Sequence, residues 1–571
     1  MPRDLAQMIW DEWALWQIVC MNFVVALLAL AVELTPETAG RLKLAWSYET
    51  RAAAPNEVAR RRAAFEATPV LVGELLYVIT PYNQVIALEP GTGLERWRFD
   101  PVVAKTRNYS ELTSRGVTVS EGRLFFGTID SRLITLNALT GKLIWEVRVG
   151  DARNDGNYQI TSAPVVAGKT LIVGSAIGDN GRVEMERGTV RAFDVASGKQ
   201  RWSWDPTPNG KTGAANAWAP MSVDAERDLV FVPTGSASPD FYGGLRPGDN
   251  RHANSVVALR ASTGKLVWAF QVVHHDLWDY DVASRPELIT FEGKPAIGVL
   301  TKVGHYFALD RMTGKTLLPV EERTVAGTDV AGETSAATQP YPLHGAFTEQ
   351  KFVPRPGWCE EEFQKLRYEG MFTPPTLKGT LLFPGNVGGA NWGSGAYDAE
   401  RKLLFVAANR LGTAVKLIPR AEFDAEKHGE TGERWGTEYA AQKGAAFGMV
   451  RRTFMGKDGM PCNRAPWGML AAIEVETGRL RWEAPMNPSL GGPMVVNGVV
   501  FFGGTVFEQK LRAFAAETGK KLWEADLPYS AHSVPGTYLW EGQRYVVVCA
   551  GGHGKVDGSK LGGSVLAYRV E

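Results

Sequence analysis

The sequence predicts an all-β protein, an eight-bladed β-propeller with Trp-docking repeats. Three observations support that prediction. One eleven-residue motif recurs along the 571 residues, short apolar segments lie between its copies, and the composition is rich in turn residues, with 62 Gly and 32 Pro. Glycine and proline at that level are typical of many short strands joined by tight turns. Small repeated sheets packed radially around an axis form a propeller, in which sheet edges are short and protected.

The recurring motif combines the end of one strand, a turn that uses glycine, and a next strand that begins with tryptophan. Its seven copies are ALEPGTGLERW (87–97), TLNALTGKLIW (135–145), AFDVASGKQRW (192–202), ALRASTGKLVW (258–268), ALDRMTGKTLL (308–318), AIEVETGRLRW (472–482) and AFAAETGKKLW (513–523). We interpret AYDAERKLLFV (396–406) as a degenerate eighth copy. The repeated tryptophan is interpreted as packing between blades and not as a cofactor contact.

The spacing of the copies is that of propeller blades. Successive motif glycines are mostly 41–66 residues apart, which is the scale of one four-stranded blade. Segments between copies, such as RLFFGT and LVFVPT, are typical of inner strands. The interval between Gly314 and Gly478 is longer, at 164 residues, and has room for insertions around 320–385 and 410–465. We therefore expect one propeller over 34–571.

The first 33 residues differ from the rest of the chain. Ile18–Val32 is an apolar run of fifteen residues, short for a transmembrane helix and similar to the hydrophobic region of a signal peptide. Asp11 and Glu12 precede it, and no clear small-residue cleavage site follows it. A signal peptide, a membrane anchor and a non-native start of the chain remain alternatives for segment 1–33.

Charge and cysteine content argue against several kinds of site. Lys plus Arg and Asp plus Glu both number 62, so no basic field indicates a nucleic-acid partner. The four cysteines form neither the CxxC spacing of a zinc site nor the CxxCH motif of covalent haem. Cys359 and Cys462 lie in loop sequence rich in Pro and Trp. Their spacing leaves open whether they form a disulfide, which would imply an oxidising compartment.

The segment HHDLWDYD (274–281) concentrates two histidines and three acids around one tryptophan, directly after the strand-like run LVWAFQVV. Other loops at similar places in their repeats carry an acid, a cation or a tryptophan. They are FEATP (65–69), LTSRGV (112–117), ITSAP (160–164), GSAIGDN (174–180), NAWAP (216–220), LTKVGH (300–305) and GGANWG (388–393). Gathered around one axis, such oxygen ligands, cations and aromatic rings suit a planar anionic cofactor held with a hard metal ion.

These motifs resemble those of the pyrroloquinoline quinone (PQQ) dependent alcohol and sugar dehydrogenases, closest to the membrane-associated glucose, polyol and quinate type. The blade motif is similar to the family's Trp-docking repeat, and segments such as NAWAPMSVD, PCNRAPWGML and VVVCAGGHG resemble that subgroup. The likeness extends from about residue 34 to the C-terminus. It implies a quinoprotein that oxidises an alcohol group of a polyol, sugar or cyclic alcohol by hydride transfer to PQQ.

The resemblance also implies roles for single residues. Asp279 matches the family's catalytic base, and Lys302 matches the cation beside the ortho-quinone oxygens. Trp218 matches the ring on which the quinone stacks. The implied cofactor contacts are Glu66, Arg115, Thr161, Trp218, Lys302 and Asn391, and the implied ligands of a Ca²⁺, Mg²⁺ or lanthanide ion are Asp179, Asn180, Asp279 and Asp281. Metal and Lys302 together are expected to keep Asp279 ionised as a general base.

Two of the chain's departures from the family pattern concern the metal and the substrate. Ser236 stands where relatives of the methanol type have an asparagine metal ligand, so the metal shell is expected to depend on the acids and Asn180. Glu111 stands where glucose enzymes have a histidine near the cofactor arginine, which argues against glucose as the substrate.

Two alternatives from other classes stay open at this point. One is a non-catalytic eight-bladed scaffold of the outer-membrane assembly type, which shares the Trp repeat but does not need a cluster of acid, cation and Trp. The other is a hydrolase or lyase propeller that uses Asp279 with His275 and a metal. For the favoured dehydrogenase, the resemblance implies a periplasmic protein that passes electrons to ubiquinone or a separate c-type cytochrome. Association with the inner membrane is left open.

Overall fold

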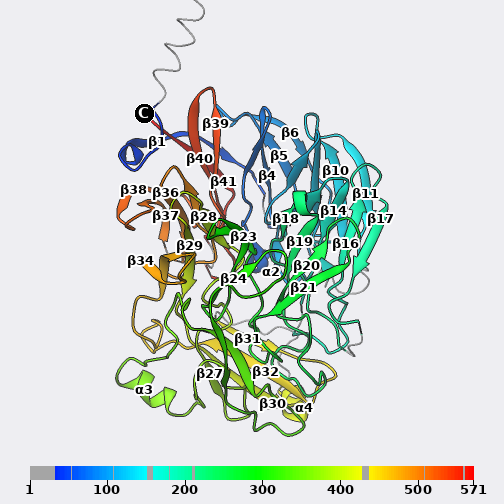
Figure 1. Ribbon diagram of the computed structural model, residues 1–571, viewed down its shortest axis with the longest axis vertical. Coiled ribbons are helices and arrows are strands. Elements are labelled where there is room, and N and C mark those ends of the chain that lie inside the picture. Colours follow the sequence, from blue (N-terminus) through cyan, green and yellow to red (C-terminus); the bar gives the residue numbers. More distant parts are fainter. Residues whose placement is uncertain are drawn as a thin grey trace, which may run out of the picture.

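The computed structural model describes residues 32–52, 54–106, 109–150, 158–178, 180–208, 212–426, 436–506, 508–556 and 560–571. Over these residues the protein is mainly β, and small antiparallel sheets are arranged around a centre (Figure 1). The predicted all-β propeller fold is confirmed. The predicted segment 1–33 lies outside the described residues except for its last two. No helix in the described ranges is long and apolar enough to span a bilayer.

The first four sheets each carry one copy of the motif, across the turn between their last two strands. They are β3–β6 (Val70–Val72, Leu75–Ile79, Val85–Leu88, Glu95–Phe99), β8–β11 (Thr118–Ser120, Arg123–Gly127, Arg132–Asn137, Leu143–Arg148), β13, β14, β16 and β17 (Val165–Ala167, Thr170–Val173, Val190–Asp194, Gln200–Trp204), and β18–β21 (Ser222–Asp224, Leu229–Pro233, Ser255–Arg260, Leu266–Gln271).

The next three sheets carry the remaining copies. They are β22–β24 (Glu287–Phe291, Lys294–Leu300, Tyr306–Asp310), β28, β29, β33 and β34 (Gly395–Asp398, Leu403–Asn409, Gly468–Glu474, Leu480–Met486), and β35–β38 (Met494–Val496, Val499–Thr505, Glu508–Ala515, Lys521–Asp526). The middle strands of these sheets are apolar and buried, whereas the last strands are partly exposed. The hydrophobic core therefore lies between neighbouring sheets.

The interpretation of segment 396–406 as a degenerate eighth copy is wrong. It spans β28 and β29, the first two strands of the sheet whose last two strands already carry the copy at 472–482. The motif-free sheet is instead built from the two ends of the chain: β1 (Leu42–Glu49) pairs with β41 (Ser564–Val570), which continues to β40 (Gln543–Ala550) and β39 (Gly536–Trp540). N-terminal sequence thus supplies the outer strand that closes the ring.

Five of the six motif tryptophans dock onto the motif glycine of the next sheet, which agrees with their interpretation as packing between blades. Trp523 faces the sheet without a motif and donates its indole N–H to the Leu42 carbonyl at 3.1 Å. Trp202 donates its indole N–H to the Ala261 carbonyl at 2.9 Å, and a Cβ added to Gly264 would lie 2.5 Å from the Trp202 ring. Trp46 of β1 docks in the same way, donating to the Pro90 carbonyl at 2.8 Å beside Gly93. In the copy at 308–318, Leu318 replaces the tryptophan.

We predict that Gly264→Ala destabilises the protein more than Gly293→Ala. Both glycines have positive φ, +71° and +77°, so both alanines incur backbone strain of about 1–2 kcal/mol. Only position 264 adds a clash with Trp202, since nothing lies within 4 Å of a Cβ at 293. We expect this clash to lower the free energy of unfolding by roughly another 1–3 kcal/mol, measured by urea denaturation. Equal losses in the two variants would mean that Trp202 does not hold neighbouring sheets together.

The expected insertions form a separate layer at one end of the molecule (Figure 1). The segment around 320–385 contains the hairpin β25 (Val320–Thr324) and β26 (Thr338–Pro342), helix α3 (Trp358–Phe363) and β27 (Thr380–Leu382). The segment around 410–465 contains β30 (Thr413–Pro419), helix α4 (Arg420–Ala425), β31 (Thr437–Ala440) and β32 (Phe447–Thr453). β27 of the first insertion and β30–β32 of the second form one sheet. A disulfide between Cys359 and Cys462 also joins the two insertions.

Short elements complete the described structure. The strand pairs β2 (Ala63–Ala64) with β7 (Leu112–Thr113), and β12 (Tyr158–Gln159) with β15 (Ala176–Ile177), lie in loops between sheets. Helix α2 (Glu57–Arg62) precedes β2, and Asn56 caps it by accepting a hydrogen bond from the Ala59 N–H at 2.8 Å. The 3₁₀ helices are η1 (Ala39–Arg41) and η2 (Ala225–Arg227).

Candidate functional site

A cavity of about 990 Å³ lies between the loops at the sheet ends and the inserted sheet β27–β30–β32–β31. The predicted site residues reach it from the ends of successive elements, because loops at equivalent places in a propeller meet near its axis. The predicted residues that line the cavity are Glu66, Arg115, Thr161, Asn180, Trp218, Asp279, Asp281, Lys302 and Asn391. Asp179 lies outside the described residues.

The loop after β21 positions the two acids that face the cavity. Asp276 accepts hydrogen bonds from the backbone N–H groups of Trp278 and Tyr280, which fixes a tight turn. The buried Trp278 donates its indole N–H to the Thr373 carbonyl at 2.8 Å and anchors the turn to the inserted segment. Asp279 then adopts a φ of +63°, an uncommon conformation that directs its carboxylate into the cavity beside Asp281.

Lys302 joins the two acids. Its buried amine donates to Asp279 Oδ1 at 2.8 Å, to the Asp279 carbonyl at 2.8 Å and to Asp281 Oδ2 at 3.0 Å. A lysine ammonium has three N–H donors, so these contacts use all of them. Contact with the oxygen of a bound cofactor therefore requires Lys302 to exchange one of these partners.

Ion pairing sets the charge states of this cluster. Burial raises the pKa of the Asp279 carboxyl, and the Lys302 and Arg451 cations oppose that rise. Burial also disfavours the charged form of Asp281, but Lys302 and the hydrogen bonds from Ser236 outweigh it, so the pKa of Asp281 is lowered. The two carboxylates in turn raise the pKa of Lys302 despite its burial. Lys302 is charged in this site, as its predicted role requires.

Ser236, the position that departs from the family's asparagine, supports the cluster from behind. Its backbone N–H donates to Asp281 Oδ1 at 2.6 Å, and its hydroxyl donates to Asp276. Ser236 is not among the residues that line the cavity. It therefore holds the acids and leaves the metal-ligand role to other residues.

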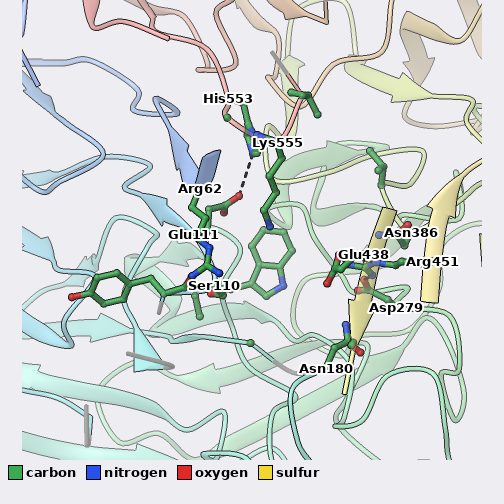
Figure 2. Close-up of a pocket in the computed structure, with 18 of the residues that line it drawn as sticks. Arg62, Ser110, Glu111, Asn180, Asp279, Asn386, Glu438, Arg451, His553 and Lys555 are labelled. Carbon is green, nitrogen blue, oxygen red and sulfur yellow. Dashed lines mark hydrogen bonds and ion pairs between the residues drawn. The ribbon is translucent and has the colours of Figure 1, made fainter. Parts of the chain in front are cut away.

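Arg115 organises the opposite side of the cavity. It donates to Thr161 Oγ1 at 2.7 Å and forms ion pairs with Glu66 at 3.0 Å and Glu111 at 3.1 Å. Burial raises the pKa of Glu66 to about 7, although Arg115 opposes the rise. For Glu111 the contacts with His553 and Arg115 outweigh burial and lower the pKa. Figure 2 shows His553 and Glu111 on this side, joined at 3.2 Å.

The donor set fits a planar anionic cofactor with a hard cation. Arg115 lies 5.1 Å from the Trp218 ring centroid and 5.2 Å from that of Trp392, so two aromatic rings and a cation border one space. Asn180 Oδ1 is buried and has no hydrogen-bond partner among the described residues, and it lines the same cavity as Asp279 and Asp281. Carboxylate and amide oxygens of this kind are ligands for Ca²⁺ and similar ions.

The inserted sheet supplies two functional residues that sequence reasoning missed. Arg451 of β32 forms an ion pair with Asp279 Oδ2 at 2.7 Å and another with Glu438 of β31, also at 2.7 Å. Figure 2 shows the three side chains together on one wall. Both residues lie in an insertion without a repeat, and the structure places them opposite each other on adjacent strands, a pairing that no motif in the sequence marks.

The two histidines of HHDLWDYD do not line the cavity. His274 hydrogen-bonds Gln271 and Glu322, and His275 hydrogen-bonds the Gly248 carbonyl at 2.6 Å. Their contacts stabilise the loop. A hydrolase or lyase that pairs Asp279 with His275 is therefore not supported by the geometry.

Comparison with known proteins gives a consistent result. The family described as "PQQ: Glucose/ethanol/alcohol dehydrogenase, beta-propeller domain" matches residues 29–546. Quinoprotein glucose dehydrogenase A of Acinetobacter calcoaceticus is 34% identical over 88% of this chain and 73% of its own length. Quinate/shikimate dehydrogenase (quinone) of Acinetobacter baylyi is 32% identical over 93% and 76%. The crystal structure of quinohemoprotein alcohol dehydrogenase from Comamonas testosteroni, 24% identical, aligns over 94% of this chain and 78% of its own with a TM-score of 0.71.

Proposed function

The chain belongs to the PQQ-dependent glucose/ethanol/alcohol dehydrogenase family, and from that premise we propose that it oxidises an alcohol group of a polyol, sugar or cyclic alcohol. It is a quinoprotein dehydrogenase that acts on CH–OH donors. The observation that carries the finer assignment is the contact between Asp279, Lys302 and Arg451 inside a cavity bordered by Trp218.

PQQ with its metal ion, when bound, supplies an electrophilic quinone carbon that accepts hydride from the alcohol carbon. Trp218 offers the stacking surface, and Arg115 with Thr161 offers donors for carboxylates. Asn180, Asp281 and Asp279 offer oxygen ligands for the metal, with Asp179 as a further proposed ligand.

The protein's own residues would handle the proton. Asp279 accepts the hydroxyl proton of the alcohol as general base. Lys302 and Arg451 hold the two Asp279 oxygens at 2.8 and 2.7 Å, which fixes the direction of the carboxylate and favours its ionised form. The inserted sheet forms the wall of the cavity on this side, from which Arg451 reaches Asp279.

Reconstitution tests this function. We predict that the apo-protein reduces a redox dye only when PQQ and a metal ion are both added, with Ca²⁺ and La³⁺ tested separately over a panel of polyols, sugars and simple alcohols. Removal of the metal with a chelator is expected to abolish dye reduction, because the bound ion polarises the quinone. A folded sample that binds no PQQ with either ion would overturn the proposal and favour the scaffold alternative.

Three further assignments belong to the same proposal. The ring has eight blades, one for each motif-bearing sheet and one for the sheet that joins the two chain ends. Electrons leave to ubiquinone or to a separate c-type cytochrome, since the sequence has no CxxCH motif for built-in haem. The protein works in the periplasm, where the disulfide between Cys359 and Cys462 is stable.

A further inference from the structure

The turn between β31 and β32 binds the loop that carries the proposed metal ligand Asn180. The Gln442 N–H donates to the Asn180 carbonyl at 3.1 Å, and the Lys443 N–H donates to the Gly181 carbonyl at 3.0 Å. In return, the Val183 N–H donates to the Lys443 carbonyl at 2.9 Å. These three hydrogen bonds join the two backbones, and both the turn and the loop contribute to the cavity wall.

The backbone of Asn180 is held, whereas its side chain is left open to a ligand. The Asn180 Oδ1 atom is buried at the cavity and accepts no hydrogen bond from the described residues. A buried amide oxygen without a partner costs free energy, and a bound hard cation removes that cost. The turn therefore fixes the backbone from which this oxygen projects.

Arg420 of helix α4 holds the turn in shape. Its Nη2 donates to the carbonyls of Ala441 and Gln442, and its Nε donates to the Ala445 carbonyl at 3.3 Å. Gln442 has a φ of +44°, an uncommon conformation that persists only where its surroundings impose it. The buried Gln442 side chain adds a hydrogen bond to the Phe447 carbonyl at 3.2 Å. The turn is thus fixed in the conformation whose N–H groups bind the loop.

The same hairpin also binds the second ligand-bearing loop. Arg451 of β32 contacts Asp279 Oδ2 at 2.7 Å, and Figure 2 shows Asn180, Asp279 and Arg451 beside the hairpin. Asn180 lies between β15 and β16 and Asp279 follows β21, so the two ligands come from different sheets. Ligand oxygens must lie about 2.3–2.6 Å from a Ca²⁺ ion, which requires a fixed separation between them. One hairpin that binds both loops supplies that constraint.

We propose that the β31–β32 hairpin positions Asn180 relative to Asp279, and that Arg420 is the positioning residue that acts through its turn. This inference rests on the proposed function, in which both residues bind the metal ion. Arg420 is not among the residues that line the cavity, so it acts on the ion only through the backbone of the turn. Loss of such an outer partner weakens metal binding by about 10–100-fold in other metal sites.

Calorimetric titration of Ca²⁺ into chelator-treated protein mixed with one equivalent of PQQ tests the proposal. We expect Arg420→Gln to raise the Kd for Ca²⁺ by about tenfold or more, because the turn no longer holds the Asn180 loop in place. Urea denaturation of the same protein without PQQ measures how much stability the substitution costs.

Arg367→Gln is the matched control. Arg367 lies in the other insertion, does not line the cavity, and donates to the Gly327 carbonyl at 2.8 Å. Each arginine also pairs with a nearby acid, and the side chains of Arg367 and Arg420 are 21% and 27% exposed. We expect the two variants to lose similar stability in urea, and Arg367→Gln to leave the Kd for Ca²⁺ unchanged.

Hydrogen exchange on the unaltered protein gives a second readout that does not depend on a variant. Addition of Ca²⁺ with PQQ should slow exchange at the amides of Gln442, Lys443 and Val183, because a held Asn180 loop stabilises the hydrogen bonds that they donate. Unchanged exchange at these amides, or equal Kd values for Ca²⁺ in the Arg420→Gln and Arg367→Gln proteins, would overturn the proposal. Failure of the proposed function would differ, since the unaltered protein would then bind no Ca²⁺ with PQQ present and both proposals would fall.

Discussion

Asp279→Asn is expected to lower kcat by about 10²–10⁴-fold, the range for loss of a general base. The amide cannot accept the hydroxyl proton, although it fills the same space between Lys302 and Arg451. We expect the variant to retain bound PQQ, because Trp218, Arg115 and Thr161 are untouched. Dye reduction measured beside the absorbance of bound quinone separates the two effects.

Glu438→Gln is the matched control for Asp279→Asn. It removes the other carboxylate that binds Arg451 but leaves the Asp279 carboxylate in contact with Lys302. We expect its kcat to fall less than tenfold. If Asp279→Asn with bound PQQ stayed within tenfold of the unaltered enzyme, Asp279 would not be the base.

Lys302→Met is expected to cause the largest loss of stability. The methionine fills a similar volume but leaves the buried carboxylates of Asp279 and Asp281 without the amine that joins them. Breaking a buried ion pair from one side costs roughly 3–5 kcal/mol, and we expect a loss of that size in the free energy of unfolding of the apo-protein. Urea denaturation followed by tryptophan fluorescence measures it. Activity should fall as well, by about 10²-fold or more.

Lys416→Met controls for the loss of a lysine as such. Lys416 lies on β30 with its side chain exposed, so its replacement should change the free energy of unfolding by less than about 0.5 kcal/mol. A Lys302→Met protein as stable as the Lys416→Met protein would show that Lys302 does not neutralise the two acids. Addition of Ca²⁺ should restore part of the lost stability, because the cation binds the same carboxylates.

Much of the fold follows from local sequence. The motif places a glycine at positive φ a fixed number of residues before a tryptophan, and this pattern can be recognised in the sequence alone. The closing sheet was harder to predict, because Trp46 lies in β1 without the glycine turn that marks the other copies. Segment 396–406 was misassigned for the opposite reason: its composition resembles the motif, but it joins the first two strands of a sheet.

Some of the site residues could also be predicted from the sequence and others could not. Residues at the ends of propeller strands, such as Arg115, Trp218 and Lys302, could be predicted because the repeat fixes where each strand ends. Arg451 and Glu438 could not, since Arg451 reaches Asp279, and Glu438 holds Arg451, from an insertion whose path over the cavity depends on tertiary packing. The sequence separation of 172 residues between Arg451 and Asp279 carries no periodic signal.

The pairing of β1 with β41 has a consequence for synthesis. Glu49 and Ser564 are hydrogen-bonded across 515 residues, so β1 can pair with β41 only after the ribosome has made the long segment between them. Until then, β1 has no strand to pair with, and other chains can join its unpaired edge. Newly made protein is thus open to aggregation through this edge until β41 has been made and has paired with β1. Chaperones that shield extended segments would act on this protein during the interval before β1 and β41 pair.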